Sequence, residues 1–270
     1  MRWRKSAVIV GILGLLCLTY PLVEPYLIGV NDVDFADGDL PGSFDGKTVV
    51  FAADFHCGPL FSVERTGDVV RMINSLKPDL ILLGGDYIFD DVNYIKPCIG
   101  ELKNLKAPLG VYGVLGNHEH WADAESSRQA LSEAGVTLLD NRAEWVELGG
   151  GRIRVGGVGD MWTDVQDIAP TVEDAAAGDF AILLSHNPDY AEGLKTDKVD
   201  LMLSGHTHGG QVTVFGLWAP VKSTAYGKYV SGMVDAGGTK VFVTKGIGMA
   251  GLPIRFFARP EIVRFHLHKE

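Results

Sequence analysis

The sequence of 270 residues contains little cysteine and no repeat. Its three cysteines, at positions 17, 57 and 98, form no Cys-x-x-Cys pair, which excludes a zinc ribbon and a disulfide scaffold. A bridge between Cys57 and Cys98 would need an oxidising compartment, and the sequence disfavours it because such pairs are rare outside disulfide-rich scaffolds. The lack of a collagen, heptad or solenoid period excludes those architectures, and a hydrophobic fraction of 46% excludes disorder as the main state.

Positive charge is also scarce. Lys and Arg total 24 against 34 Asp and Glu, which gives a formal net charge of −10. Residues 1–30 hold three of the bases and one acid, so the other 240 residues hold 21 bases and 33 acids and carry −12. Such a surface repels polyanions and disfavours nucleic acid as a partner. An anionic substrate would therefore need bound cations that reverse the local field.

A hydrophobic run lies at the N-terminus. Three basic residues precede a stretch, residues 7–23, that is apolar with two exceptions. No A-x-A cleavage pattern follows, so we expect residues 1–30 to be an uncleaved signal anchor forming a transmembrane helix, rather than a cleaved signal or a buried core helix. The basic residues predict a cytoplasmic N-terminus and a body outside the cytoplasm. The polar residues 31–46 predict a linker into one folded domain, residues 47–270.

The first half of this domain alternates apolar runs with helical spacing, which predicts βαβ units and a largely parallel sheet. We expect strands at 48–53, 79–83 and 110–115 and helices at 62–76, 94–105 and 124–134. The second half is rich in strand-like segments, at 144–148, 152–155, 180–184, 199–203, 211–215, 228–234, 240–244 and 261–268. Three glycines between the first two of these indicate a hairpin. Together these patterns predict an α/β domain.

Five of the apolar strands are followed directly by residues of the types that bind metals. These residues are Asp54 and His56, Asp86, Asn117 with His118 and Glu119, His186, and His206 with His208. Ligands of α/β sheets bind at the carboxyl ends of strands, so we expect these side chains at one edge of the core. Two Asp, one Asn and four His exceed what one tetrahedral zinc takes and suit two ions that share a carboxylate.

Each motif alone has a plainer explanation. An Asp-x-His pair is usually a loop, a Gly-Asp pair a turn, and Asn117 with Glu119 fits a helix N-terminus. An isolated His186 is more often a core histidine that hydrogen bonds its neighbours. The five motifs in order, each after an apolar strand, favour a shared site. The sequences around Ser185 and Ser204 do not fit a nucleophile elbow, which disfavours a serine hydrolase, and the glycines at 156–159 lack dinucleotide-binding spacing.

In this order the motifs resemble the calcineurin-like metallophosphoesterase superfamily, whose pattern is D-x-H, G-D, G-N-H-[DE], H and G-H-x-H. The resemblance covers about residues 48–245. The segments 209–211, 252–256 and 260–262 resemble its bacterial branch of membrane-anchored or exported phosphodiesterases, which implies the bacterial inner membrane as the location. The resemblance also implies a four-layer α/β/β/α sandwich of two mixed sheets.

The resemblance assigns roles to the residues at the strand ends. Asp54, His56 and His208 would hold one divalent metal ion, Asn117, His186 and His206 the other, and Asp86 would bridge both. His118 would face the phosphoryl group as a catalytic residue, and Glu119 would orient it. The ions would be Mn, Fe, Zn or similar, and a hydroxide held between them would hydrolyse a phosphodiester or pyrophosphate.

The substrate is less well specified by the sequence. Some relatives cleave the lipid precursor UDP-diacylglucosamine, but its nucleotide lies in the cytoplasm, opposite to the side expected for this domain. A phosphomonoesterase and a non-catalytic metal-binding scaffold are the alternatives. A purple acid phosphatase is disfavoured because Phe89 stands where that class carries its metal-bound tyrosine. The apolar stretch 246–257 suits lipid contact but more often forms a core-packing loop. Arg255 and Arg259 could meet phosphate, but lone surface arginines usually do not.

Overall fold

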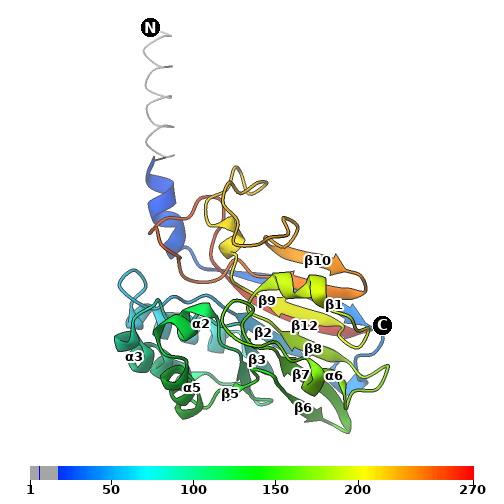
Figure 1. Cartoon of the computed structure of the whole chain (residues 1–270). Helices are drawn as coiled ribbons and strands as arrows, with labels where there is room; N and C mark the ends of the chain where they lie inside the picture. The colour runs from blue at the N-terminus through cyan, green and yellow to red at the C-terminus, as the bar shows by residue number, and fades with distance from the viewer. Residues whose placement is uncertain (1–5, 7–17) are drawn as a thin grey trace.

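Two six-stranded mixed sheets form the body of the computed structural model, which describes residue 6 and residues 18–270 (Figure 1). The strand order is β1-β12-β2-β3-β4-β5 in the first sheet and β10-β11-β9-β8-β7-β6 in the second. The strands of the first sheet are β1 (Gly29–Asp37), β2 (Thr48–Ala52), β3 (Leu80–Leu83), β4 (Val111–Gly113), β5 (Thr137–Leu138) and β12 (Glu261–Lys269). The expected α/β fold with two mixed sheets is confirmed.

The second sheet is built from β6 (Arg142–Leu148), β7 (Gly151–Gly157), β8 (Ala181–Leu184), β9 (Leu201–Ser204), β10 (Gly232–Ala236) and β11 (Thr239–Val243). β6 and β7 form the expected hairpin, in which Gly149 and Gly150 take the positive φ angles of the turn. β7, β8 and β9 run parallel, as do β2, β3 and β4 in the first sheet. Of these parallel strands, β2, β3, β8 and β9 are short and buried on both faces, which explains their continuous apolar sequences.

Helices cover the outer face of the first sheet. They are α2 (Val63–Ser75), α3 (Ile95–Gly100), α4 (Asn117–Ala122) and α5 (Ala124–Glu133), while the short α6 (Ala169–Val172) lies on the second sheet. The 3-10 turns are η1 (Glu24–Tyr26), η2 (Gly42–Phe44), η3 (Val92–Tyr94), η4 (Glu101–Asn104), η5 (Pro188–Gly193) and η6 (His208–Gly210). Ser62 caps α2 and Asp123 caps α5 by accepting backbone N–H bonds.

The main hydrophobic core lies between the two sheets. Phe51 and Phe265 from the first sheet and Ile182 and Leu203 from the second are fully buried there. The rings of Phe242 and Phe265 meet edge to face at 5.2 Å across the interface. This packing fixes the two sheets against each other, so the loops at their strand ends keep a constant relative position.

Three sequence-based expectations about elements need correction. The supposed linker 31–46 begins within β1, a strand paired in parallel with β12 over nine residues. It read as a linker because this edge strand buries only Phe35 and carries polar residues on its open side. Residues 211–215 form only isolated bridges, and the helix expected at 94–105 divides into η3, α3 and η4.

The predicted membrane anchor lies mostly outside the described residues, since 1–5 and 7–17 are not among them. Residues 18–23 are helical and lead into η1. Within the part of the chain that the structure describes, no helix has the length and apolar character needed to cross a bilayer.

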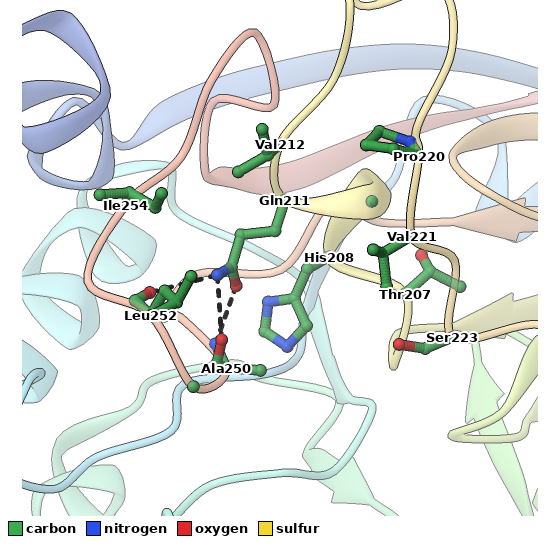
Figure 2. A pocket seen from close by; sticks show the side chains of 12 residues that line it. Thr207, His208, Gln211, Val212, Pro220, Val221, Ser223, Ala250, Leu252 and Ile254 are labelled. Carbon is green, nitrogen blue, oxygen red and sulfur yellow. Dashed lines mark hydrogen bonds between the residues drawn. The ribbon is translucent and has the colours of Figure 1, made fainter. Parts of the chain in front are cut away.

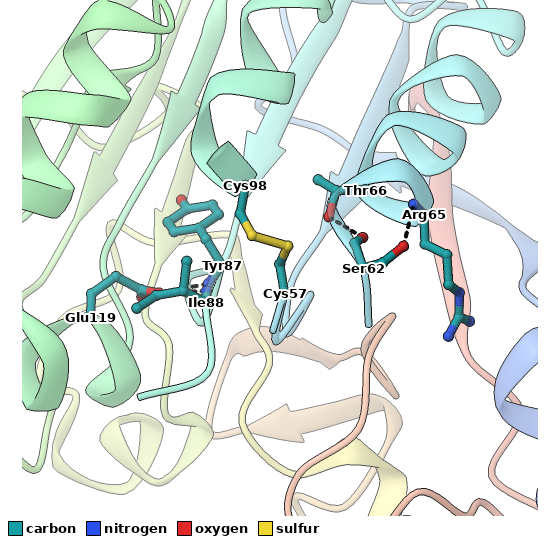
Figure 3. Close-up of a disulfide and its surroundings, with 8 residues drawn as sticks. All are labelled: Cys57, Ser62, Arg65, Thr66, Tyr87, Ile88, Cys98 and Glu119. Atoms are coloured by element: carbon teal, nitrogen blue, oxygen red, sulfur yellow. Dashed lines mark hydrogen bonds between the residues drawn. A yellow bond between two sulfur atoms is a disulfide. The ribbon is translucent and has the colours of Figure 1, made fainter. Parts of the chain in front are cut away.

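A disulfide joins Cys57 to Cys98, contrary to the expectation from the sequence (Figure 3). The two Cα atoms lie 6.0 Å apart, and the bond links the loop after β2 to helix α3. The pairing was missed because 41 positions separate the cysteines and no local pattern reports their proximity. Both cysteines are buried, and Cys57 directly follows His56, so the bond attaches the loop that carries His56 to the hydrophobic core.

Candidate metal centre

The polar residues that follow the strands meet at one edge of the two sheets. Five of them adopt positive φ angles, a conformation that is unfavourable for any residue other than glycine: Asp54, His56, Asp86, His206 and His208. Backbone hydrogen bonds between neighbouring loops maintain it, since Asp54 N–H donates to the Gly85 carbonyl and His56 N–H to that of Asp86. Strained backbone of this kind concentrates at functional sites, where it aims side chains at a common point.

Glycine is required where these loops touch. A Cβ on Gly116 would lie 2.2 Å from Asp86 Oδ1, and one on Gly205 would lie 2.6 Å from Asp54 Oδ2. Both distances are shorter than any real carbon contact, so a side chain at either position would displace a carboxylate. Gly116 thus allows the loop after β4 to approach Asp86, which follows β3. Gly205 allows the loop after β9 to approach Asp54, which follows β2.

Asp86 occupies the centre of the cluster. Its Oδ2 atom lies 3.1 Å from His186 Nε2 and 3.5 Å from His56 Nε2. The potential ligand atoms form two adjoining groups. Asp54, His56 and His208 make one, and Asp86, His186 and His206 make the other, with all ligand atoms of a group within 4.8 Å of one another. Asp86 also forms a group with His56, so it connects the two halves of the site.

The donor set fits metal ions better than it fits hydrogen bonding alone. Asp54 Oδ2, Asn117 Oδ1 and His206 Nε2 are buried and have no hydrogen-bond partner among the described residues. His56 Nε2 and His208 Nε2 lie 2.9 Å apart, so in the metal-free site one neutral ring can donate to the other. Buried polar atoms without partners are costly, and cations that accept their lone pairs would remove that cost. Residues of both halves therefore suit a dinuclear centre.

Burial and charge control the protonation of these groups. Burial lowers the pKa of His56 and of His206 to about 3 each, so both rings are neutral and have free lone pairs. Burial acts to raise the pKa of Asp86, but the charge and hydrogen bond of His186 outweigh it and hold this pKa well below its usual range. Asp86 is thus ionised, which is the form in which a carboxylate binds a metal ion.

His118 lies at the rim of the cluster and is held on its far side by Asp90. Its Nδ1 atom is 2.6 Å from Asp90 Oδ1, and its Nε2 atom is 3.9 Å from Asp86 Oδ2. The ring stacks on Phe89 at 5.2 Å and meets Trp121 edge-on at 4.8 Å. These contacts direct Nε2 toward the site, and sequence reasoning missed the part of Asp90 because it lies four residues beyond Asp86 in an irregular loop.

Glu119 does not contact His118 in the way the family resemblance implied. Its carboxylate is fully buried and accepts backbone N–H bonds from Asp86 (2.9 Å), Tyr87 (2.7 Å), Ile88 (3.1 Å) and Gly116 (2.9 Å). Figure 3 shows it reaching the segment that carries Tyr87 and Ile88. Glu119 therefore fixes the loop of Asp86, and the carboxylate in contact with the His118 ring is that of Asp90.

Arg255 was expected on the surface and is instead fully buried behind His208. Its guanidinium donates to the carbonyls of Gly248 (2.6 Å) and Ala258 (2.7 Å) and places Nη2 3.2 Å from His208 Nδ1. The signal available in the sequence was its position inside an apolar run, where a charged residue must have partners. It holds the stretch 246–258 against the ligand loop.

Two tryptophans, also missed, border the site. Trp162 meets His206 edge-on at 4.3 Å, and Trp121 stacks on Trp162 at 6.3 Å. Both rings are about half exposed, so they form an open aromatic wall. Tyr87 points away, because its hydroxyl donates to the Val114 carbonyl at 2.9 Å within the core. At the position where a purple acid phosphatase carries its tyrosine, Phe89 instead stacks on His118.

Comparison with known proteins agrees with this geometry. Residues 47–210 match the model of the calcineurin-like phosphoesterase family. The uncharacterized metallophosphoesterase YkuE of Bacillus subtilis is 35% identical over 91% of this chain and 87% of its own. Phosphodiesterase YaeI of Escherichia coli is 31% identical over 81% of both chains.

A solved structure shares the fold alone. The sulfate thiohydrolase SoxB of Thermus thermophilus superposes with a TM-score of 0.50 at 14% identity, over 83% of this chain and 56% of that one. The family match and the sequence identities to these relatives show the family of the chain, whereas this structural likeness shows only its fold. With its buried Asp and His clusters, the chain belongs to the calcineurin-like phosphoesterase family of metal-dependent phosphoesterases.

Proposed function

We propose that this protein hydrolyses a phosphodiester or pyrophosphate at a dinuclear metal centre. The observation that carries the proposal is the position of Asp86, whose Oδ2 lies within 3.5 Å of histidines from both ligand groups. A carboxylate shared in this way is what two ions close together require. Asp54, His56 and His208 would hold one ion, and Asn117, His186 and His206 the other. Bound there, two divalent ions would supply an activated water and positive charge for the phosphoryl group.

The residues around the ions complete the chemistry. His118 presents Nε2 to the site while Asp90 holds Nδ1, so the ring is placed to donate a hydrogen bond or a proton to a phosphoryl or leaving-group oxygen. Glu119 keeps the loop of Asp86 rigid through four N–H bonds. No nucleophilic side chain is needed for this reaction.

Two observations support a location outside the cytoplasm, at the bacterial inner membrane. The Cys57–Cys98 disulfide is a bond that persists in oxidising compartments. The basic residues before the hydrophobic stretch 7–23 favour a single-pass anchor with a cytoplasmic N-terminus. This location favours lipid-linked phosphoesters as substrates but conflicts with UDP-diacylglucosamine, whose nucleotide is cytoplasmic.

The ions are Mn, Fe, Zn or similar, since Asp, Asn and His ligands accept each of them.

The test uses the full chain in detergent, freed of metal by a chelator. Hydrolysis of bis(p-nitrophenyl) phosphate and of p-nitrophenyl phosphate is then followed with Mn²⁺, Fe²⁺ or Zn²⁺ added, and bound metal is counted by elemental analysis. We expect metal-dependent cleavage of the diester and loss of at least about a hundredfold in His118→Ala. A preference for the monoester would instead indicate a phosphomonoesterase. Two bound ions without turnover of any phosphoester would indicate a non-catalytic scaffold.

A further inference from the structure

A cavity of about 480 Å³ opens beside the metal centre (Figure 2). It lies between the segment 207–212, the loop 220–223 and the loop 250–254. Its size is within the range of small-molecule sites. Apolar side chains dominate its lining: Val212, Pro220, Val221, Ala250, Leu252 and Ile254. None of these residues has a part in the metal chemistry described above.

The cavity and the metal centre share His208. The imidazole of this residue lines the cavity, and its Nε2 atom lies 2.9 Å from His56 Nε2 in the ligand cluster. Thr207, the residue between the two histidines of the G-H-x-H motif, lines the cavity as well. A phosphoryl group on the metals would therefore have one of its substituents at the entrance of an apolar space.

The walls of the cavity are fixed to one another without a ligand. The Gln211 amide donates to the carbonyls of Ala250 (2.9 Å) and Leu252 (3.2 Å) and accepts from Ala250 N–H (2.8 Å), as Figure 2 shows. The loop 220–223 forms another wall, and Gly210 allows this loop to pack closely, because a Cβ on Gly210 would lie 2.3 Å from the Cβ of Ala219. The Gly209-Gly210-Gln211 sequence, which catalysis leaves unexplained, thus builds this cavity.

The rim of the cavity is also apolar. Val221 and Leu252 line the cavity yet remain 74% and 64% exposed. Exposed apolar groups collected in this way mark a surface for an apolar partner. Burial of part of a substrate chain would remove some of this surface from water.

The helical residues 18–23 are attached to the same loops. The Tyr20 ring meets Phe256 at 5.9 Å and Phe257 at 5.7 Å, and Arg255 N–H donates to the Pro21 carbonyl. This helix continues the hydrophobic sequence 7–23, which is expected to enter a membrane. The loop 250–257 thus connects the cavity with the segment of the chain nearest to lipid.

From these observations we infer that the cavity beside His208 binds the hydrocarbon chain of an amphiphilic phosphoester, whose phosphoryl group reaches the metals. The inference rests on the proposed function and names its substrate class, an alkyl, acyl or prenyl phosphodiester or pyrophosphate. Hydrocarbon suits the apolar lining, and each buried methylene adds affinity. The phosphorus–oxygen bond is cleaved by water, so the reaction needs no further reactant.

The experiment compares p-nitrophenyl alkyl phosphates with chains of two, four, six and eight carbons, used below their micelle-forming concentrations with the metal-loaded full chain. We expect kcat/KM to rise at least about tenfold from the ethyl to the octyl ester. Leu252→Asp places a charge at the cavity and is expected to abolish this rise. Met233→Asp on β10, also at an exposed apolar residue, is the matched control and should preserve it.

Binding of ethyl- and octylphosphonate by calorimetry separates the two hypotheses. Hydrolysis with a flat chain-length series would overturn the cavity inference alone. Tight binding of the octyl compound without any hydrolysis would contradict the proposed function alone. A phenyl ester that outperforms the octyl ester, and that loses this advantage in Leu252→Asp, would show that the cavity takes an aromatic group and would also overturn the inference.

Discussion

Asp90 Oδ1 lies 2.6 Å from His118 Nδ1, on the side of the imidazole that faces away from the metal centre. The two atoms are in close contact but form no hydrogen bond, so Asp90 acts on the ring through its charge and its packing. The other nitrogen, Nε2, is left facing Asp86 at 3.9 Å. If His118 serves the phosphoryl group as proposed, Asp90 would be a positioning residue that acts through this ring.

Replacing Asp90 tests this role. We expect Asp90→Asn to lower kcat about 10- to 100-fold while KM changes little, because the ring loses orientation and substrate contacts remain. The Asp90→Asn variant should also alter the pH dependence of kcat, which a purely structural change would leave in place. Asp174→Asn, at an exposed carboxylate outside the cluster, is the control. Unchanged kcat in Asp90→Asn would show that the contact has no catalytic consequence.

The main role predicted for Glu119 is to stabilise the fold rather than to take part in the reaction. Glu119→Ala leaves four buried N–H donors without their acceptor, and we expect the metal-free protein to lose about 4 kcal/mol of unfolding free energy. His118→Ala is the matched comparison at the adjacent position and should cost less than about half of this. Urea denaturation of both variants measures the difference. Equal costs would contradict the assignment of Glu119 as the residue that holds the Asp86 loop.

The disulfide makes stability dependent on redox conditions. Its 41-residue separation corresponds to about 4 kcal/mol of loop-closure entropy in the unfolded chain. A reductant is therefore expected to lower the urea midpoint of the natural protein. The double variant Cys57→Ala/Cys98→Ala should start at the lower midpoint and show no response to reductant. A midpoint of the natural protein that is insensitive to complete reduction, verified by thiol counting, would contradict this prediction.

The raised pKa of Asp200, a residue away from the metal centre, is expected to make the free energy of unfolding depend on pH. Burial raises its pKa from 3.8 to about 6, with repulsion from Asp37 and Asp39 in the same direction, although its carboxylate accepts Ala181 N–H at 2.7 Å. Because the folded pKa lies above the unfolded one, the favourable contribution is complete below about pH 4 and is lost as the pH rises through 6. The side chain is partly exposed, so screening reduces the effect to about 1 kcal/mol.

The variant Asp200→Asn removes this titration while it keeps an oxygen that accepts the Ala181 N–H bond. It should be more stable than the natural protein by about 1 kcal/mol at pH 8, with no difference at pH 4. Denaturation of the metal-free protein at pH 4, 6 and 8 measures this trend. A difference that stays constant over this pH range would contradict the raised pKa.

The parts of the molecule that the sequence predicted have a common physical origin. β2, β3, β8 and β9 are buried on both faces, so their continuous apolar runs are easy to recognise, and each run ends in an abrupt change to polar residues. Their convergence then follows from the parallel arrangement of the strands. What could be predicted was therefore the set of elements that combine burial with an abrupt change to polar residues.

The features that were missed depend on contacts between distant segments. Asp90 and Arg255 gain their roles from the positions of His118 and His208, which are 28 and 47 residues away in the sequence. The disulfide likewise depends on how α3 packs. β1 was hidden because an edge strand needs only one apolar face, and its alternating polar residues are typical of a linker too. Local patterns contain no information on such pairings.

The pairing of β1 with β12 sets the order in which the domain can be completed. β12 lies between β1 and β2, so the segment that follows the hydrophobic N-terminus has no strand of this sheet to join until β12 is in place. During synthesis β12 emerges after the other eleven strands of the two sheets. The first sheet can therefore be completed only after β12 has emerged, and any chain truncated before Glu261 would leave β1 without its partner strand.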